Sequence, residues 1–157
     1  MPLVRILVDG YSLLHNWREL APGSARHSSA ARDALIEALR QYRDSIGTPI
    51  TIVFDGHSAP AGTPKMPSSP ELEILFSRQG QTADEVIERA AYRLKDYGEV
   101  LVITDDYAER DTVINMGGMA QSCDTFMAQI KSASDDLQAD VKHHNRREQE
   151  RYRNRVK

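Results

Sequence analysis

The stretch Arg5–Ser12, RILVDGYS, joins an apolar run to a carboxylate and a glycine close to the start of the chain. A short run rich in valine, isoleucine and leucine is typical of a buried strand, which we expect at Leu3–Val8. Asp9 and Gly10 then end this strand. A single Asp-Gly pair is an ordinary turn signal, so the meaning of Asp9 depends on how the other strands end.

Strands and helices alternate along the rest of the chain. Further strands are expected at 50–54, 72–76, 100–103 and 119–121. A loop that contains Pro22, Gly23 and serines is expected before Ser28, and the proline-rich segment 56–70 is expected to be an irregular loop. Helical periodicity predicts helices from Ser28 or Ser29 to Gly47, over 83–94, from Asp106 to Gly117, and after Ser122. Such alternation predicts an α/β fold with a mainly parallel sheet covered by helices on both faces. The carboxyl ends of the strands then share one edge, where open α/β sheets bind ligands.

Charge is distributed unevenly between the two ends of the chain. The net charge of −3 combines a basic segment, 142–157, which holds seven Lys/Arg against two Glu, with a remainder of −8. The apolar stripe of the last predicted helix fades beyond about Asp135, so we predict one domain over 1–135, followed by a basic C-terminal helix or flexible tail over 136–157. No apolar run is long enough to span a bilayer, and the start of the chain does not have the pattern of a secretory signal. The single cysteine, Cys123, fits a reducing compartment, so a cytoplasmic location is expected.

Acidic residues follow several of the predicted strands. The first strand ends in Asp9, the second in Asp55 and the fourth in Asp105-Asp106, and the third is followed by QGQTADE, which contains Asp84. Carboxylates gathered on one sheet edge would repel one another and raise their pKa values. A hard cation removes this conflict, since Mg²⁺ or Mn²⁺ binds carboxylate and water oxygens. The pattern therefore predicts a metal site suited to hydrolysis of a phosphodiester.

Each acid also has a purely structural interpretation. Asp9 and Asp55 precede glycines and could form turns. Thr82 and Glu85 make a capping box at the start of a helix, which leaves Asp84 free to face the sheet edge. Asp106 could likewise cap its helix with Glu109 as the partner three residues later, which leaves Asp105 without a structural role.

Several segments together resemble the YacP-like NYN family within the PIN-like nuclease group. They are ILVDGYS, AARDALIEALRQY, ITIVFDGH, LEILFSRQGQTADEVIERAA and VLVITDDYAER, and the resemblance covers about Leu3 to Ile130. It implies a Rossmann-like three-layer α/β/α fold and divalent-metal-dependent endoribonuclease activity. It also implies an association with ribosomes and messenger RNA decay.

The resemblance assigns roles to individual residues. Asp9, Asp84 and Asp106 match the family's acids and are predicted to be catalytic, binding metal directly or through water. Asp105 stands where serine is usual and, with Asp55, is predicted to assist metal binding. Ser12 stands where the family has asparagine. Its hydroxyl is shorter than an amide, so the metal ligands can be kept while the positioning of substrate or water at Ser12 can differ from that in the family.

Contacts to RNA require cations and stacking groups. Arg78 is placed to meet a phosphate, although a solvated loop arginine is equally compatible. Trp17, Tyr11 and Tyr107 could stack on bases, although Trp17 also fits a core position. The tail could contact RNA or a ribosomal surface, or could be solvated; its candidate residues are Arg146, Arg147, Arg151, Arg153 and Arg155.

The sequence thus predicts a Mg²⁺- or Mn²⁺-dependent endoribonuclease that hydrolyses RNA phosphodiester bonds, acting on mRNA in association with the ribosome. A non-catalytic RNA- or ribosome-binding module with a degenerate nuclease site is the alternative, favoured by Ser12. A DNA-directed nuclease of the same chemistry is a weaker third interpretation. The sequence leaves the oligomeric state open.

Overall fold

The computed structural model describes residues 3–56 and 68–156. Most of the predicted loop at 56–70 lies outside these ranges. The described chain runs in the order β1 (Leu3–Asp9), α1 (Gly10–Asn16), α2 (Ser29–Ile46), β2 (Ile50–Phe54), β3 (Leu72–Phe76), α3 (Ala83–Leu94), β4 (Glu99–Ile103), α4 (Tyr107–Asn115), β5 (Met119–Gln121) and α5 (Cys123–Val156).

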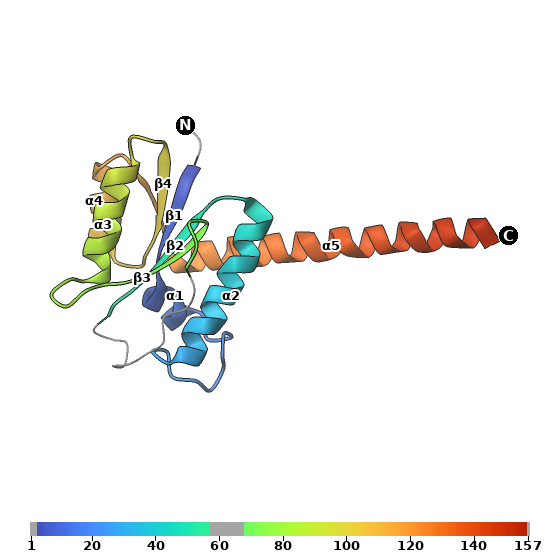
Figure 1. The fold of residues 1–157 in the computed structure, drawn as a ribbon, viewed down its shortest axis with the longest axis horizontal. Helices are drawn as coiled ribbons and strands as arrows, with labels where there is room; N and C mark the ends of the chain where they lie inside the picture. The colour runs from blue at the N-terminus through green and yellow to red at the C-terminus, as the bar shows by residue number, and fades with distance from the viewer. Residues whose placement is uncertain (1–2, 57–67, 157) are drawn as a thin grey trace.

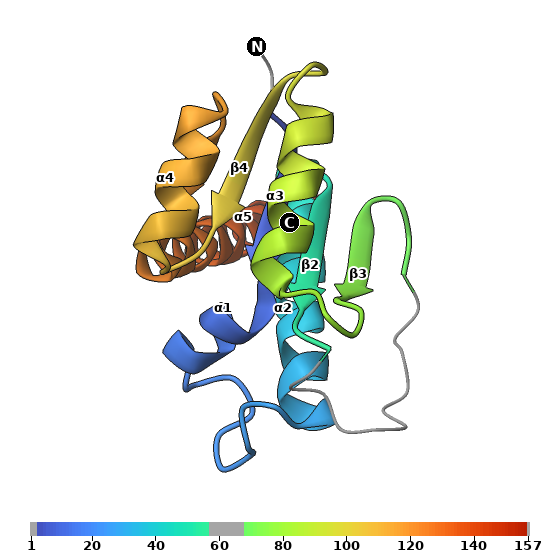
Figure 2. The same ribbon diagram turned by 90° about the vertical axis from the view of Figure 1, so that its left-hand side faces the viewer.

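The five strands form one sheet in the order β3-β2-β1-β4-β5, with every neighbouring pair parallel. The predicted α/β class and the predicted strands are therefore confirmed. Helices α3 and α4 cover one face of the sheet, and α1, α2 and the first part of α5 cover the other (Figures 1 and 2). The result is a three-layer sandwich.

The central strand β1 shows how the sheet is buried on both faces. Ile6 and Val8 belong to the core beneath α1, α2 and α5, whereas Leu7 belongs to the core beneath α3 and α4. Successive side chains of a strand point to opposite faces, so a continuous apolar run is what a strand buried on both sides requires. All three side chains are at most 2% exposed.

The direction in which the chain winds changes at β1. The chain passes from β1 to β2 over the face covered by α1 and α2, and from β3 to β4 through α3 on the other face (Figure 2). The boundary between β1 and β4 is therefore the topological switch point of the sheet, where α/β proteins of this kind bind ligands at the carboxyl ends of the strands.

Helix α1 corrects the sequence-based expectation of a loop after Gly10. Asp9 caps this helix by accepting a hydrogen bond from the backbone N–H of Ser12, and Leu13 and Leu14 are fully buried. The Asp9-Gly10 pair is thus a strand-to-helix junction rather than a turn. Gly10 is required there because an added Cβ would lie 2.4 Å from Cε1 of Phe54.

The other predicted helix boundaries are confirmed. Ser28 caps α2, and Gly47 ends it in the left-handed conformation with φ of 76°. Thr82 caps α3 and Asp106 caps α4 through their side chains. The last helix continues without a break through residue 135, the predicted end of the domain, to Val156, and its outer half extends away from the sandwich (Figure 1).

Candidate active site

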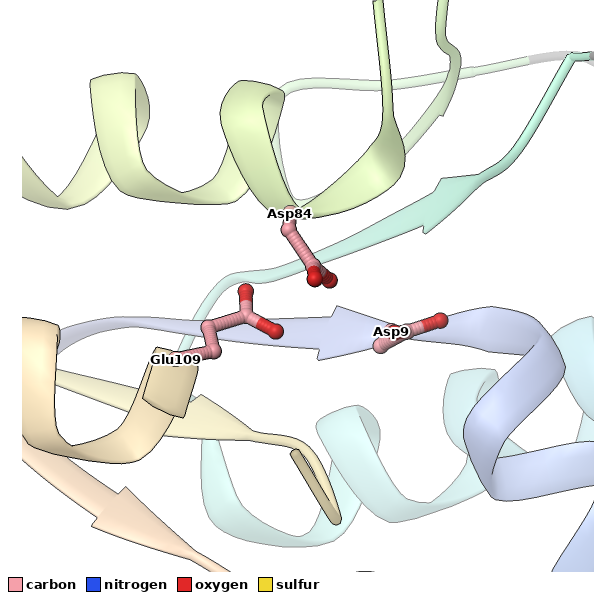
Figure 3. A group of neighbouring side chains, drawn as sticks. All are labelled: Asp9, Asp84 and Glu109. Atoms are coloured by element: carbon pink, nitrogen blue, oxygen red, sulfur yellow. The ribbon is translucent and has the colours of Figure 1, made fainter. Parts of the chain in front are cut away.

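Three carboxylates converge at the switch point. Each of Asp9, Asp84 and Glu109 offers an oxygen, and these oxygens lie within 4.8 Å of one another. Asp9 ends β1, whereas Asp84 and Glu109 lie in the first turns of α3 and α4. Figure 3 shows the side chains of Asp84 and Glu109 pointing toward each other, with Asp9 beside them at the end of β1.

The Asp9 carboxylate is fixed by Ser12. One oxygen, Oδ1, accepts a hydrogen bond of 3.3 Å from the Ser12 backbone N–H, and Oδ2 accepts one of 3.1 Å from the Ser12 hydroxyl. Burial raises the pKa of Asp9, and the nearby Asp84 and Asp55 raise it further, although the Ser12 hydrogen bonds act in the opposite direction. Asp9 therefore lies where its negative charge is only partly compensated.

Asp84 is positioned by the start of α3. The Thr82 hydroxyl accepts a hydrogen bond of 3.2 Å from the Glu85 backbone N–H, as the predicted capping box requires. This cap fixes the first turn, in which Ala83 is buried, Asp84 is half-buried toward the other acids, and Glu85 is exposed. Glu85 therefore belongs to the helix cap, as the capping-box interpretation predicts, and Asp84 is free to face the sheet edge.

Glu109 is the residue that sequence reasoning missed. It was expected only as a capping partner of Asp106, yet its side chain is 2% exposed and faces Asp84 and Asp9. Neither of its carboxylate oxygens accepts a hydrogen bond of ordinary geometry from the described residues. Burial, followed by the neighbouring Asp84 carboxyl, raises the pKa of Glu109 to about 9. The available signal was its place in the first turn of a helix that follows a strand, the same kind of position that Asp84 occupies in α3.

Asp106 lies outside this group because it serves the helix backbone. Its exposed carboxylate accepts hydrogen bonds from the backbone N–H groups of Ala108, at 2.9 Å, and Glu109, at 3.3 Å. Its role as a metal ligand, directly or through water, stays a prediction.

Asp105 links three elements instead of extending the acidic group. Its Oδ1 accepts a hydrogen bond of 2.9 Å from the Cys123 backbone N–H at the start of α5, and its Oδ2 accepts one of 2.6 Å from the Asn16 amide at the end of α1. The same Asn16 amide donates to the Ser12 carbonyl at 2.8 Å. A continuous set of hydrogen bonds thus runs from α5 through Asp105, Asn16 and Ser12 to Asp9.

Asp55 lies beside the site without joining the three-carboxylate group. Its Oδ1 accepts a hydrogen bond of 3.3 Å from the Ser77 hydroxyl, and it is near enough to Asp9 to raise that residue's pKa. Its assistance in metal binding remains a prediction.

The predicted RNA-contacting residues are distributed over several surfaces. Arg78 is exposed in the loop before α3. Trp17 is half-buried and packs against the core beneath α2 and α5, whereas Tyr11 is buried and therefore cannot stack on a base. Tyr107 is 77% exposed, and the Arg110 guanidinium lies 4.2 Å from the centre of its ring. The tail arginines with described side chains, Arg146, Arg147, Arg151 and Arg153, are all exposed on α5.

A parallel α/β sandwich with an acidic group at its switch point defines a class of α/β proteins with a candidate metal site. The sequence model of the family described as "YacP-like NYN domain" matches residues 6–157. The chain therefore belongs to the YacP-like NYN family, which is nuclease-like and has an RNA-related function.

Individual relatives agree with this assignment. The chain is 30% identical over 128 residues to the "Uncharacterized protein YacP" of Bacillus subtilis (strain 168), covering 81% of this chain and 75% of the relative. It is similar to the crystal structure of Rae1 (YacP) from Bacillus subtilis, with a TM-score of 0.76 and 28% identity over 90% of this chain and 80% of that one. A tryptophan-to-leucine mutant of the same protein gives a TM-score of 0.74 at 27% identity, over 88% and 80% of the two chains. In the described part of this chain, no helix is long and apolar enough to cross a membrane.

Proposed function

We propose that this protein is a divalent-metal-dependent endoribonuclease that hydrolyses RNA phosphodiester bonds. The observation that carries the proposal is the convergence of Asp9, Asp84 and Glu109 at the switch point, within 4.8 Å of one another. Membership in a nuclease-like family supports the same chemistry.

The donor set fits Mg²⁺ or Mn²⁺. Both are hard cations that prefer carboxylate oxygens and retained waters. The Glu109 carboxyl is buried with no hydrogen bond of ordinary geometry from the described residues, so ionising it there without a neighbouring positive charge is costly. A cation held by Asp9, Asp84 and Glu109 would offset that cost, with Asp106, Asp105 and Asp55 acting through water. When bound, such an ion activates water and stabilises negative charge at a phosphate.

The remaining residues of the site position the acids and the substrate. The Ser12 backbone N–H holds Oδ1 of Asp9 and the Ser12 hydroxyl holds Oδ2, so this serine orients the Asp9 carboxylate. Arg78, exposed before α3, is proposed to bind a substrate phosphate. Trp17 stays a candidate for substrate positioning, although its half-buried place against the core favours a structural role.

The substrate and its setting belong to the same proposal. We assign RNA as the substrate, cytoplasmic mRNA on the ribosome as its setting, and the basic outer half of α5 as a contact for RNA or a ribosomal surface. The arginines proposed for that contact are Arg146, Arg147, Arg151, Arg153 and Arg155. Exposed cations bind nucleic acid through release of counterions.

The test replaces Asp84 by asparagine and measures Mn²⁺-dependent cleavage of a single-stranded RNA. Asp84→Asn removes a charge from the three-carboxylate group without changing the size of the side chain, and cleavage is expected to be lost while the melting temperature is retained. Glu85→Gln, the exposed neighbour on the same turn of α3, is the matched control and should cleave as wild type does. Unchanged cleavage by Asp84→Asn would contradict the site assignment.

A non-catalytic RNA- or ribosome-binding module is the second candidate, favoured by the basic, exposed outer half of α5. This alternative expects that no preparation cleaves RNA with Mn²⁺, and that RNA binding disappears when residues 142–157 are removed.

A further inference from the structure

The outer half of α5 is a long helix without support from the sandwich. All described side chains from 134 to 154 are exposed. Isolated helices are marginally stable in water, and most helices in proteins are stabilised by packing of an apolar face. The outer half nevertheless carries large apolar side chains: Leu137 is 55% exposed, Val141 51% and Tyr152 70%. A surface that packs against this helix is therefore needed.

These apolar side chains form one stripe. Ile130, Leu137, Val141 and Tyr152 are separated by 7, 4 and 11 residues, which correspond to about two, one and three turns of an α-helix. The stripe is continuous with the core of the sandwich, since Ile130 is 8% exposed and belongs to that core.

The stripe begins at a pocket. A cavity of about 490 Å³ between α2 and α5 is lined mainly by apolar side chains, with Ile130 and Leu137 contributed by the stripe itself. Trp17, Tyr42 and Met127 line the same cavity. An aromatic side chain from outside the sandwich would fit among them.

The distribution of charge along α5 indicates which kind of helix can pack against it. Residues 123–141 hold four aspartates against one lysine, a net charge of −3, whereas residues 142–157 carry +5. Two such helices side by side in the same direction would place like charges together. When the two helices run in opposite directions, the basic half of each helix lies along the acidic half of the other, and the electrostatic interaction is attractive.

We infer that two copies of this chain form a homodimer through antiparallel pairing of their α5 helices about a twofold axis near Val141. Tyr152 lies 11 residues after Val141 and Ile130 lies 11 residues before it, so each is about 16 Å from the axis. The partner's Tyr152 then lies level with Ile130 and enters the pocket beside Trp17 and Tyr42. A twofold interface of this kind is self-complementary, and each copy supplies the same residue and the same pocket.

The same register pairs opposite charges. Asp136 lies five residues before Val141 and Arg147 six residues after it, so Asp136 of one copy lies level with the partner's Arg147. Asp136 and Arg147 are 11 residues apart, about three turns, and so share one flank of the helix. Arg146 and Arg153 lie as far around the helix from Val141 as Asp136 and Arg147 do, about 120–140°, but on the other side. Both pairs are therefore at the outer rim of the dimer, where the arginines can also contact nucleic acid.

Sedimentation equilibrium of the full-length chain tests the dimer. The wild type is expected to dimerise, and Val141→Glu, at the centre of the stripe, is expected to weaken the association at least about tenfold. Ala139→Glu adds the same charge on the opposite side of the same turn and should leave the dimer intact. A chain that stays monomeric at all accessible concentrations, or equal effects of the two substitutions, would overturn the inference.

Cross-linking and charge exchange test the register. Val141→Cys places two thiols at the axis, so mild oxidation should give a disulfide-linked dimer on a non-reducing gel, whereas Ala139→Cys should not. The native Cys123 is buried and takes no part. Arg147→Asp should weaken the dimer, and Arg147→Asp combined with Asp136→Arg should restore it. Absence of the Val141→Cys cross-link, failure of restoration, or a monomer whose α5 binds only RNA would each contradict the antiparallel pair.

Discussion

The acidic edge of the sheet and the outer half of α5 carry opposite charges. The charged side chains at the edge are buried or hydrogen-bonded, whereas those on α5 are exposed to solvent. At the edge, Asp9 is fixed by two hydrogen bonds from Ser12, and Glu109 is almost completely buried. On the outer half of α5, the described arginines are exposed, and Arg151 pairs with Glu148 at 3.2 Å across one helical turn. Electrostatic interactions at the edge are therefore strong and depend on single atoms, whereas those on α5 are screened by salt and shared among several residues.

The largest expected effect comes from the acid that the sequence analysis did not assign to the site. Glu109→Gln should lower Mn²⁺-dependent RNA cleavage by at least about 100-fold, because even residues that only support metal ligands typically contribute 10–100-fold. The measurement is the single-turnover cleavage rate across a Mn²⁺ titration. Asp111→Asn, an exposed acid on the same helix, is the matched control and should cleave normally. Full activity of Glu109→Gln would remove Glu109 from the site.

The same carboxyl makes the metal-free protein sensitive to pH. Its pKa is about 9 in the folded protein and near 4.5 ordinarily. The folded state therefore retains a proton that the unfolded state loses, so the free energy of unfolding should fall as pH rises from about 4.5 to about 9. Burial also raises the pKa of Asp9, so this residue contributes a change in stability of the same sign. In EDTA, the melting temperature should decrease over this range, by about 2–4 °C for each kcal/mol lost.

Two variations sharpen that measurement. Glu109→Gln cannot ionise and should flatten the pH dependence of the melting temperature. Mn²⁺ should stabilise the wild type more at pH 8 than at pH 5, because metal binding requires deprotonated ligands. A melting temperature in EDTA that is as pH-dependent in Glu109→Gln as in the wild type would show that this carboxyl is not the cause.

A substitution of Asp105 tests the hydrogen bonds that connect the acidic edge of the sheet to the start of α5. Asp105→Ala removes the carboxylate that accepts hydrogen bonds from the Cys123 backbone N–H at the start of α5 and from the Asn16 amide. Each lost hydrogen bond costs about 0.5–1.5 kcal/mol, so thermal unfolding should occur several degrees lower, with only a modest fall in the cleavage rate. Asp106→Ala removes the cap of α4 instead and serves as the comparison. A collapse of metal-dependent cleavage in Asp105→Ala at unchanged stability would instead favour Asp105 as a metal ligand.

Removing residues 142–157 should have the smallest effect on chemistry. The folded sandwich and the single-turnover rate at saturating RNA should be retained, whereas RNA affinity should fall at low salt. If all five net positive charges contact phosphate, the slope of log affinity against log salt should decrease in size by up to about 3.5. An unchanged slope would show that the outer half of α5 does not contact RNA.

Much of the fold followed from local pattern. The strands, the sheet class and the caps Ser28, Thr82 and Asp106 were predictable, because side-chain periodicity and capping act over a few residues. Helix α1 was missed because the polar group that caps it, Asp9, was assigned to a turn or to a metal. In the structure Asp9 caps the helix and also faces the other carboxylates.

The site was only partly predictable. Asp9 and Asp84 could be found because a strand end and a helix start at the sheet edge fix their position. The choice between Asp106 and Glu109 could not be made from spacing, because both lie in the same capping motif. Only the packing of α4 against the sheet and α3 turns Glu109 inward toward Asp84 and leaves Asp106 exposed.

The sequence by itself determined the alternating elements, the acids at their ends and the opposite charges of the two regions, because these depend on residue type and short-range order. Tertiary structure alone decided which carboxylates lie together and which accept hydrogen bonds from the backbone of a helix instead. Asp105 accepts a hydrogen bond from the first residue of a helix that begins 18 residues later, and Glu109 reaches Asp9 from α4, the helix that follows β4 on the other side of the switch point. Such contacts depend on the order of strands in the sheet, which sets distances that no local pattern contains.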